Sequence, residues 1–131
     1  MIEVEVFGAE LARGEPPLAE VRRLCVLAAA SAGVHDGHVA IEFVGSERIT
    51  ELNGKHRGKA TVTDVLSFPI DGAEPPAVAR ELGDVVICPE HTADLREAIV
   101  HGVLHLAGMD HETDQGEMLA LQRELLAAEG A

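Results

Sequence analysis

Hydrophobic and polar residues alternate at the start of the chain and then change to a helical spacing. The alternation over residues 2–6 has the two-residue period of a half-buried strand. Apolar residues then recur at helical spacing over residues 17–33, and alternation resumes over residues 39–43. A strand, a helix and a strand of these lengths fit a right-handed crossover, so we expect the two strands to be parallel.

The rest of the chain predicts shorter strands and further helices. In chain order we expect a helix over residues 46–53, a strand over residues 61–69, a strand over residues 83–89, a helix from residue 92 to about residue 106, and a last helix after residue 113. Ser46 and Thr113 are the expected capping residues of their helices. Pro69 should limit the pairing of its strand, because proline cannot donate a backbone hydrogen bond.

Residues 101–111, HGVLHLAGMDH, carry the clearest chemical pattern in the chain. His101 and His105 are four residues apart and therefore project from one face of a helix. Gly108 permits the positive φ that ends a helix, so the chain can turn back and bring His111 toward that face. A single histidine on an apolar helix is usually a core residue, but this spacing favours metal binding. Three imidazoles and a water form a catalytic zinc site, so we expect one zinc ion per chain.

The residue after the first histidine distinguishes this stretch from a peptidase motif. The metzincin pattern HExxHxxGxxH has the same histidine spacing, and its glutamate is the general base for peptide hydrolysis. Gly102 occupies that position here. A zinc ion with three imidazole ligands lowers the pKa of its bound water to about 7. The missing glutamate is therefore compatible with another hydrolytic reaction.

Composition indicates a single domain with an aliphatic core. The chain has 131 residues, of which 47% are hydrophobic and 2% aromatic. A chain of this length buries roughly two-thirds of its unfolded surface. No apolar run approaches the roughly 18 residues of a membrane span, and the acidic N-terminus is no signal peptide, so we expect a cytoplasmic protein. Cys25 and Cys88 lack CxxC spacing and are expected to be buried, reduced thiols.

Charge restricts where an anionic ligand can bind. The net charge of −13 argues against nucleic-acid binding over the whole surface. One exception is the basic cluster, which consists of Lys55, His56, Arg57 and Lys59 and contains both lysines of the chain. Because turn-forming residues surround it, this cluster could be an ordinary solvated loop. Alternatively, Arg57 could hold a phosphate by paired hydrogen bonds.

These motifs together resemble the YbeY family, bacterial metal-dependent endoribonucleases of ribosomal RNA maturation. The histidine stretch resembles the family signature, and three further pieces occur in the family's order. These pieces are the LN…R…TDVLSFP block, present as Leu52, Asn53, Arg57 and residues 63–69, the GDVVIC strand, and the acidic C-terminal helix with its leucines. The resemblance covers about residues 40–131.

The resemblance implies a fold and a set of site residues. The expected fold is a single α+β (α/β) domain over residues 1–131, with a small mixed sheet of about four strands and helices packed against it. The metal-bearing helix is expected to line a groove. The metal ligands fall on His101, His105 and His111, and the residues assigned to catalysis are Arg57 and His101.

The resemblance also implies an activity and partners. We expect a zinc-dependent, single-strand-specific endoribonuclease in ribosomal RNA maturation, notably at the 3′ end of the small-subunit RNA, and in ribosome quality control. The expected partners are ribosomal RNA and ribosomal or small-subunit proteins, with neither DNA nor a membrane. A zinc metallopeptidase-like hydrolase and a ribosome assembly factor with a structural metal remain as alternatives.

Some positions depart from the family pattern or have an open role. The segment between Cys88 and His101 is shorter than usual, so a helix normally found there should be abbreviated or merged with the metal-bearing one. Asp110 and Asp64 could each orient a ligand histidine, or could simply be turn or capping residues. His35 and His38 are expected to be surface residues, and we assign them no role.

Overall fold

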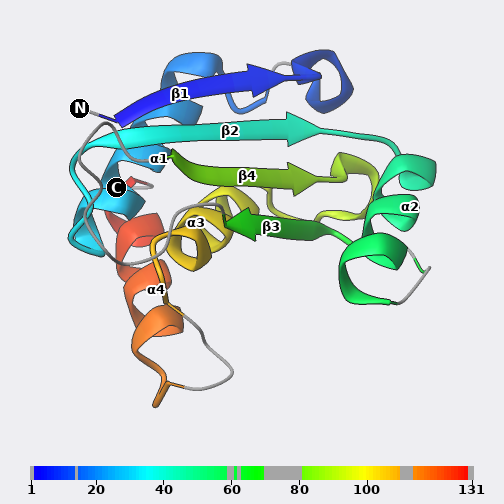
Figure 1. Ribbon diagram of the computed structural model, residues 1–131. Helices are drawn as coiled ribbons and strands as arrows, with labels where there is room; N and C mark the ends of the chain where they lie inside the picture. Colours follow the sequence, from blue (N-terminus) through cyan, green and yellow to red (C-terminus); the bar gives the residue numbers. More distant parts are fainter. Residues whose placement is uncertain are drawn as a thin grey trace.

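The structure, a computed structural model, describes residues 2–13, 15–58, 61, 63–69, 81–109 and 114–129. Within these ranges the side chains of Arg57 and Glu129 are not described. Figure 1 shows a twisted sheet with helices on both of its faces. The predicted α+β class with a small mixed sheet is confirmed.

The sheet has four strands in the order β1-β2-β4-β3. The strands are β1 (Ile2–Phe7), β2 (Gly37–Phe43), β3 (Val65–Pro69) and β4 (Glu81–Ile87). β1, β2 and β4 run parallel to one another, whereas β3 pairs antiparallel with β4 at the edge. The predicted parallel pairing of the first two strands is therefore confirmed. Pro69 ends β3 opposite Gly83, in agreement with the expectation that it limits the pairing.

Three helices build the main core on one face of the sheet. They are α1 (Leu18–Ser31), α3 (Leu95–Leu106) and α4 (Glu117–Glu129). Their apolar residues pack on inward-facing strand residues, and the fully buried members include Leu24, Val39, Ile41, Val85, Ile99, Val103 and Met118. Across this layer Arg96 of α3 forms a paired hydrogen bond with Glu20 of α1, at 2.5 and 2.9 Å. The core is aliphatic, as the composition predicted.

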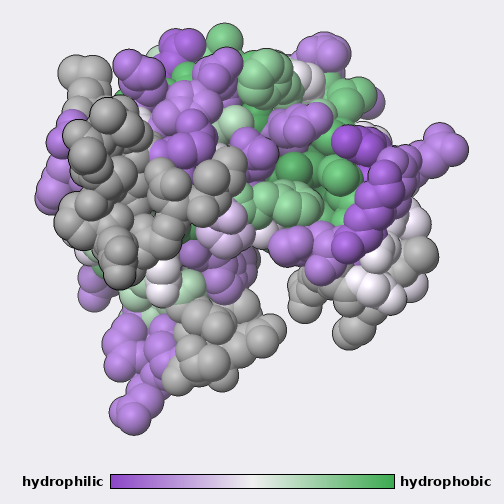
Figure 2. Space-filling view, viewed as in Figure 1, coloured by the Kyte–Doolittle hydropathy of each residue, from purple (hydrophilic) through white to green (hydrophobic). Residues whose placement is uncertain are grey.

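The opposite face of the sheet is covered at one end by α2 (Ser46–Arg57). Under α2 lies a smaller core of Val44, Ile49, Leu66, Val86 and Cys88. In Figure 2 hydrophilic side chains cover α2, and a hydrophobic area lies over the strands beside it. The packing of α2 on the sheet thus places its last turn, which carries part of the basic cluster, near one end of the sheet.

Three predicted helix boundaries were wrong. Helix α2 continues past Asn53 to Arg57 and ends at Gly58, whose φ is 73°. Ser46 is the first helical residue rather than the cap, since Gly45 occupies the cap position and no side-chain cap bond forms. Helix α3 begins at Leu95 rather than residue 92, because the Asp94 carboxylate accepts hydrogen bonds from the Arg96 and Glu97 amides. Thr113 lies outside the described residues.

Two short 3₁₀ helices complete the described structure, η1 (Ala9–Ala12) and η2 (Pro89–His91). Together with a short loop, η2 is all that lies between Cys88 and the N-terminal end of α3. Within the described ranges, no helix is long and apolar enough to cross a membrane.

Candidate functional site

Helix α3 holds two histidines of the predicted metal site side by side. The ring centroids of His101 and His105 are 4.8 Å apart, with an interplanar angle of 76°. The Nδ1 atom of His101 lies 2.8 Å from the side-chain oxygen of Gln122 in α4. The Nδ1 atom of His105 lies 3.0 Å from the carbonyl oxygen of Met109. Because both partners are oxygen acceptors, each ring donates from Nδ1 and carries its lone pair on Nε2. This is the tautomer in which histidine binds a metal through Nε2.

The turn after α3 follows the predicted course up to Met109. Gly108 has a φ of 103°, and its amide donates to the carbonyl of His105. The Met109 amide then donates to the carbonyl of Leu104, which returns the chain toward the helix. Asp110 and His111 lie outside the described residues, so the third ligand stays a prediction.

Gly102 lies between the two histidines on the side of α3 that faces the sheet. A Cβ atom at this position would lie 2.4 Å from Cγ1 of Val85 in β4. The carbonyl oxygen of Gly102 also accepts a hydrogen bond of 3.3 Å from the Ser67 hydroxyl of β3. A glutamate at residue 102 would therefore be directed into the sheet instead of toward a substrate. The packing explains why this position lacks the general base of the peptidase motif.

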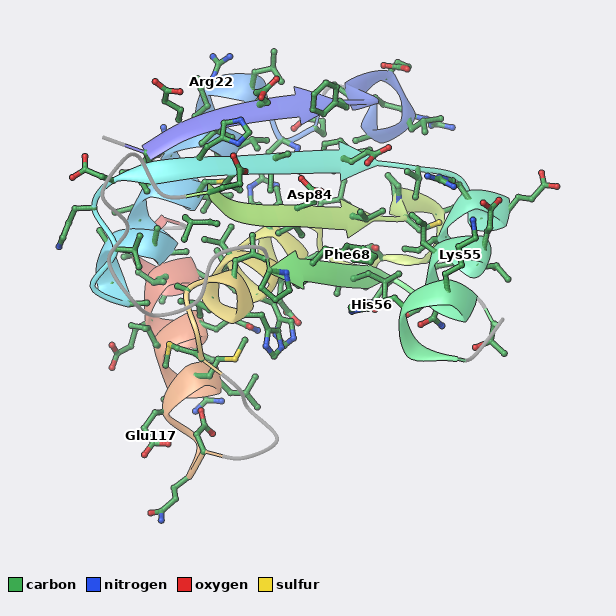
Figure 3. The ribbon with its side chains drawn as sticks, in the orientation of Figure 1. Arg22, Lys55, His56, Phe68, Asp84 and Glu117 are labelled. Atoms are coloured by element: carbon green, nitrogen blue, oxygen red, sulfur yellow. The ribbon has the colours of Figure 1, made fainter. Side chains whose placement is uncertain are left out.

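The first three residues of the basic cluster form the last turn of α2, not a loop as its composition allowed. The His56 ring packs on the Phe68 ring of β3, with centroids 4.4 Å apart and an interplanar angle of 48° (Figure 3). Lys55 is largely exposed, and its Nζ lies 3.3 Å from a carboxylate oxygen of Glu51. The backbone of Arg57 belongs to this turn, while its side chain is outside the described part of the structure.

The edge strand β3 contacts both halves of the predicted site, one on each of its sides. Phe68 contacts His56 on one side of the strand, and the neighbouring Ser67 contacts Gly102 on the other. The last turn of α2 and the histidine-bearing turn of α3 are thus each joined to β3 through consecutive residues. Asp64, at the start of β3, accepts a hydrogen bond of 2.9 Å from the amide of Val65. A hydrogen bond of this kind is typical of an aspartate in a turn.

A second group of metal-binding side chains was not identified from the sequence. Donor atoms of Cys88, Glu90 and His91 all lie within 4.8 Å of one another, so these residues could hold a metal ion. The Cys-Pro-Glu-His order was the available signal, but three ligands this close in sequence can converge only if the chain turns tightly. The 3₁₀ helix η2 provides that turn. Both cysteines are free and buried, as predicted.

His38, predicted to be a surface residue and assigned no role, makes contacts with two neighbouring strands. Its Nδ1 lies 2.7 Å from Glu81 and its Nε2 lies 2.5 Å from Glu5, so the ring joins three strands. The hydrogen bond with Glu81 is the largest influence, and it raises the pKa of His38 above its ordinary value. Burial, reinforced by the nearby charge of Glu81, raises the pKa of Asp84 on the same face.

Comparisons with known proteins show which family the chain resembles. The sequence profile of the family described as "Endoribonuclease YbeY" matches residues 18–130. A protein of that name from Anaeromyxobacter sp. (strain Fw109-5) is 38% identical over 138 residues, which cover 95% of this chain and 71% of the relative. Another, from Bacillus subtilis (strain 168), is 36% identical over 141 residues and 88% of each chain. Among solved structures, the solution structure of a Thermotoga maritima protein is similar, with a TM-score of 0.56 and 26% identity. This similarity covers 95% of this chain and 86% of that one.

Proposed function

This chain belongs to the endoribonuclease YbeY family, and from that premise we propose that it is a zinc-dependent endoribonuclease acting on ribosomal RNA. The single observation that carries the metal part of the proposal is the pair of histidines on α3. Their rings lie 4.8 Å apart, and both donate from Nδ1 to an oxygen, which presents Nε2 as the ligand atom. His111 is the third ligand in this proposal.

The donor set suits zinc. Neutral imidazoles are ordinary zinc ligands, and three of them leave one position for water or substrate. A zinc ion held there would supply Lewis-acid stabilisation of the negative charge that develops on the phosphoryl group. Gln122 and the Met109 carbonyl fix the orientation of the two rings, which is the usual task of such hydrogen bonds beside a metal.

The basic cluster is the proposed contact with RNA. The chain carries a net charge of −13, so binding to a phosphate backbone requires a local concentration of positive charge. The last turn of α2 supplies Lys55, His56 and Arg57 beside β3. In this proposal Arg57 holds a phosphate oxygen pair and stabilises its charge during cleavage, and His101 acts as a metal ligand.

The finer biological role is part of the same proposal. We propose single-stranded RNA as the substrate, processing at the 3′ end of small-subunit ribosomal RNA as the reaction, and ribosome quality control as a further task. Small-subunit ribosomal proteins are proposed partners, since a protein with this excess of negative charge gains from a partner that brings it to RNA.

Two other functions are less well supported. A metallopeptidase needs a general base, and the usual position for it is Gly102, which packs on Val85. An assembly factor with a structural metal would have a closed site with four protein ligands, whereas the proposed set has three. Neither alternative has an observation of its own in its favour.

Cleavage of an end-labelled ribosomal RNA fragment tests the proposal. The zinc-loaded protein is compared with an equally purified His105→Ala variant, whose helix should persist because alanine favours helix formation. We expect cleavage by the parent protein and none by the variant. Equal cleavage by both proteins would indicate a contaminating nuclease, and absence of cleavage in both would reject the endoribonuclease assignment.

A second comparison tests the role of Arg57. The Arg57→Ala protein should keep its zinc. Its rate of RNA turnover should fall by about ten-fold or more, because removing one group that stabilises charge in a transition state typically lowers kcat by about 10²–10³-fold. Arg48→Ala is the matched control, since Arg48 lies at the other end of α2 and pairs with Glu51. Unchanged turnover in Arg57→Ala would refute the phosphate contact.

A further inference from the structure

The end of β4 and the turn that follows it bring three different metal-binding groups together. Cys88 follows β4 directly, and Glu90 and His91 belong to η2. One thiol sulfur, one carboxylate oxygen and one imidazole nitrogen lie within 4.8 Å of one another. These residues are distinct from the paired histidines of α3 and take no part in the proposed cleavage of RNA.

The backbone of this turn is held by several hydrogen bonds. The amide of Cys88 donates to the carbonyl of Asp64 at 2.8 Å, and the carbonyl of Cys88 accepts from the His91 amide at 3.1 Å. The Thr92 hydroxyl donates to the same carbonyl at 2.6 Å. The turn is therefore fixed before an ion arrives, and little conformational entropy remains to be lost on binding.

The burial of the donors is asymmetric. Cys88 is fully buried in the smaller core under α2, whereas Glu90 and His91 are exposed. An ion at this place would be held from below by sulfur and from the solvent side by the carboxylate and the imidazole. Because Glu90 and His91 are exposed, an ion can approach this place directly from the solvent.

Ser46, the first residue of α2, completes the surroundings. Its hydroxyl donates to the carboxylate of Glu90 and lies 2.9 Å from Nε2 of His91. Since the hydroxyl proton is used for Glu90, its oxygen accepts the proton on Nε2, and the lone pair of His91 then resides on Nδ1. This hydrogen bond orients a ligand imidazole in the way seen beside protein-bound metals.

We propose that Cys88, Glu90 and His91 form a second metal site, which binds a zinc-class divalent ion independently of the histidines on α3. Sulfur and nitrogen donors select zinc-class ions over magnesium and calcium, which prefer oxygen donors alone. The Cys88 thiol releases its proton to the solvent when the ion binds, because the thiolate is the ligand form. The ion ties η2 to the end of β4 and, through Ser46, to the start of α2.

Cobalt substitution tests this site separately from the histidine site, because only a thiolate ligand gives an intense sulfur-to-cobalt charge-transfer band in the near ultraviolet. Metal-free protein is titrated with Co²⁺, and the parent protein should show the band. Cys88→Ala should abolish it, while Cys25→Ala, which removes the other buried thiol, should retain it. His105→Ala should retain the band as well, so failure of the proposed nuclease site would not affect this result. Excess Zn²⁺ should remove the band, and excess Mg²⁺ should not.

Variants of the exposed ligands guard against a folding defect in Cys88→Ala. His91→Ala and Glu90→Gln lie on the surface and should each weaken the cobalt affinity reported by the band by about ten-fold or more. A parent protein without the band would overturn the proposal. So would a band that persists in Cys88→Ala, or unchanged affinity in both surface variants.

Discussion

Gly102→Ala probes the contact that fixes the paired histidines against the sheet. The added Cβ would lie 2.4 Å from Cγ1 and 2.9 Å from Cγ2 of Val85, so either α3 or Val85 must move. Overpacking of this kind costs about 1–3 kcal/mol, while alanine in place of glycine gains about 1 kcal/mol of helix propensity. We therefore expect a net loss of up to about 2 kcal/mol.

Thermal and urea unfolding measure this loss. For a chain of this size, 1 kcal/mol corresponds to roughly 4 °C in Tm, so the variant should melt several degrees lower. Zinc affinity should also fall, because a shift of α3 away from β4 displaces His101 and His105. Val85→Ala removes the clashing methyl groups and is the matched background in which to repeat the substitution.

Comparing Gly102→Ala in the parent chain and in Val85→Ala shows whether the loss of stability comes from the steric clash with Val85. Gly102→Ala should be less destabilising in Val85→Ala than in the parent chain, because the two residues are in contact. A Gly102→Ala protein that is more stable than the parent would refute the packing argument, since helix propensity alone would then decide the outcome. An equal loss of unfolding free energy in the parent chain and in Val85→Ala would show that the strain does not arise from contact with the Val85 methyl groups.

Three further predictions concern other contacts. The pKa of His38 lies above its ordinary value of 6.5, so the stability that His38 contributes is complete below pH 6.5 and is lost as the pH rises through the raised pKa. His38→Gln should therefore remove this part of the pH dependence of Tm. The hydrogen bond to Arg96 lowers the pKa of Glu20, so the contribution of Glu20 to stability is present above pH 4.5 and is lost as the pH falls through the lowered pKa. In urea unfolding at neutral pH, Glu20→Gln should lower the free energy of unfolding by only about 0.5 kcal/mol, because the Arg96 side chain is 42% exposed. Gln122→Leu should weaken zinc binding about 10–100-fold by releasing Nδ1 of His101, and calorimetric affinities equal to those of the parent chain would contradict that role.

Local pattern predicted most of the elements, because each has a clear period. The alternation in β1 and β2 and the helical spacing between them were enough to predict a parallel pair. The end of α2 was missed because Asn53 and Gly54 have turn propensity. The packing of His56 on Phe68 supports one further turn of helix, which then ends at the left-handed Gly58, and this tertiary contact is not visible in local composition.

The candidate site likewise has parts that local sequence predicts and parts that depend on tertiary packing. The relation between His101 and His105 follows from helical geometry alone, so the sequence was sufficient for it. Gln122 could not be assigned as the partner of His101, because α4 meets α3 only through tertiary packing. Likewise, the donors around Cys88 converge only because η2 turns tightly after β4.

Zinc titration into the metal-free Cys88→Ala protein, with metal binding and RNA cleavage measured on the same samples, tests the central claim most directly. This background removes the proposed second site, so the account predicts that cleavage rises with added zinc and saturates at about one equivalent. The same protein carrying His105→Ala should neither bind that equivalent nor cleave the RNA. Cleavage that is independent of zinc, or that persists in the double variant, would contradict the claim that the histidines of α3 hold the metal of an endoribonuclease.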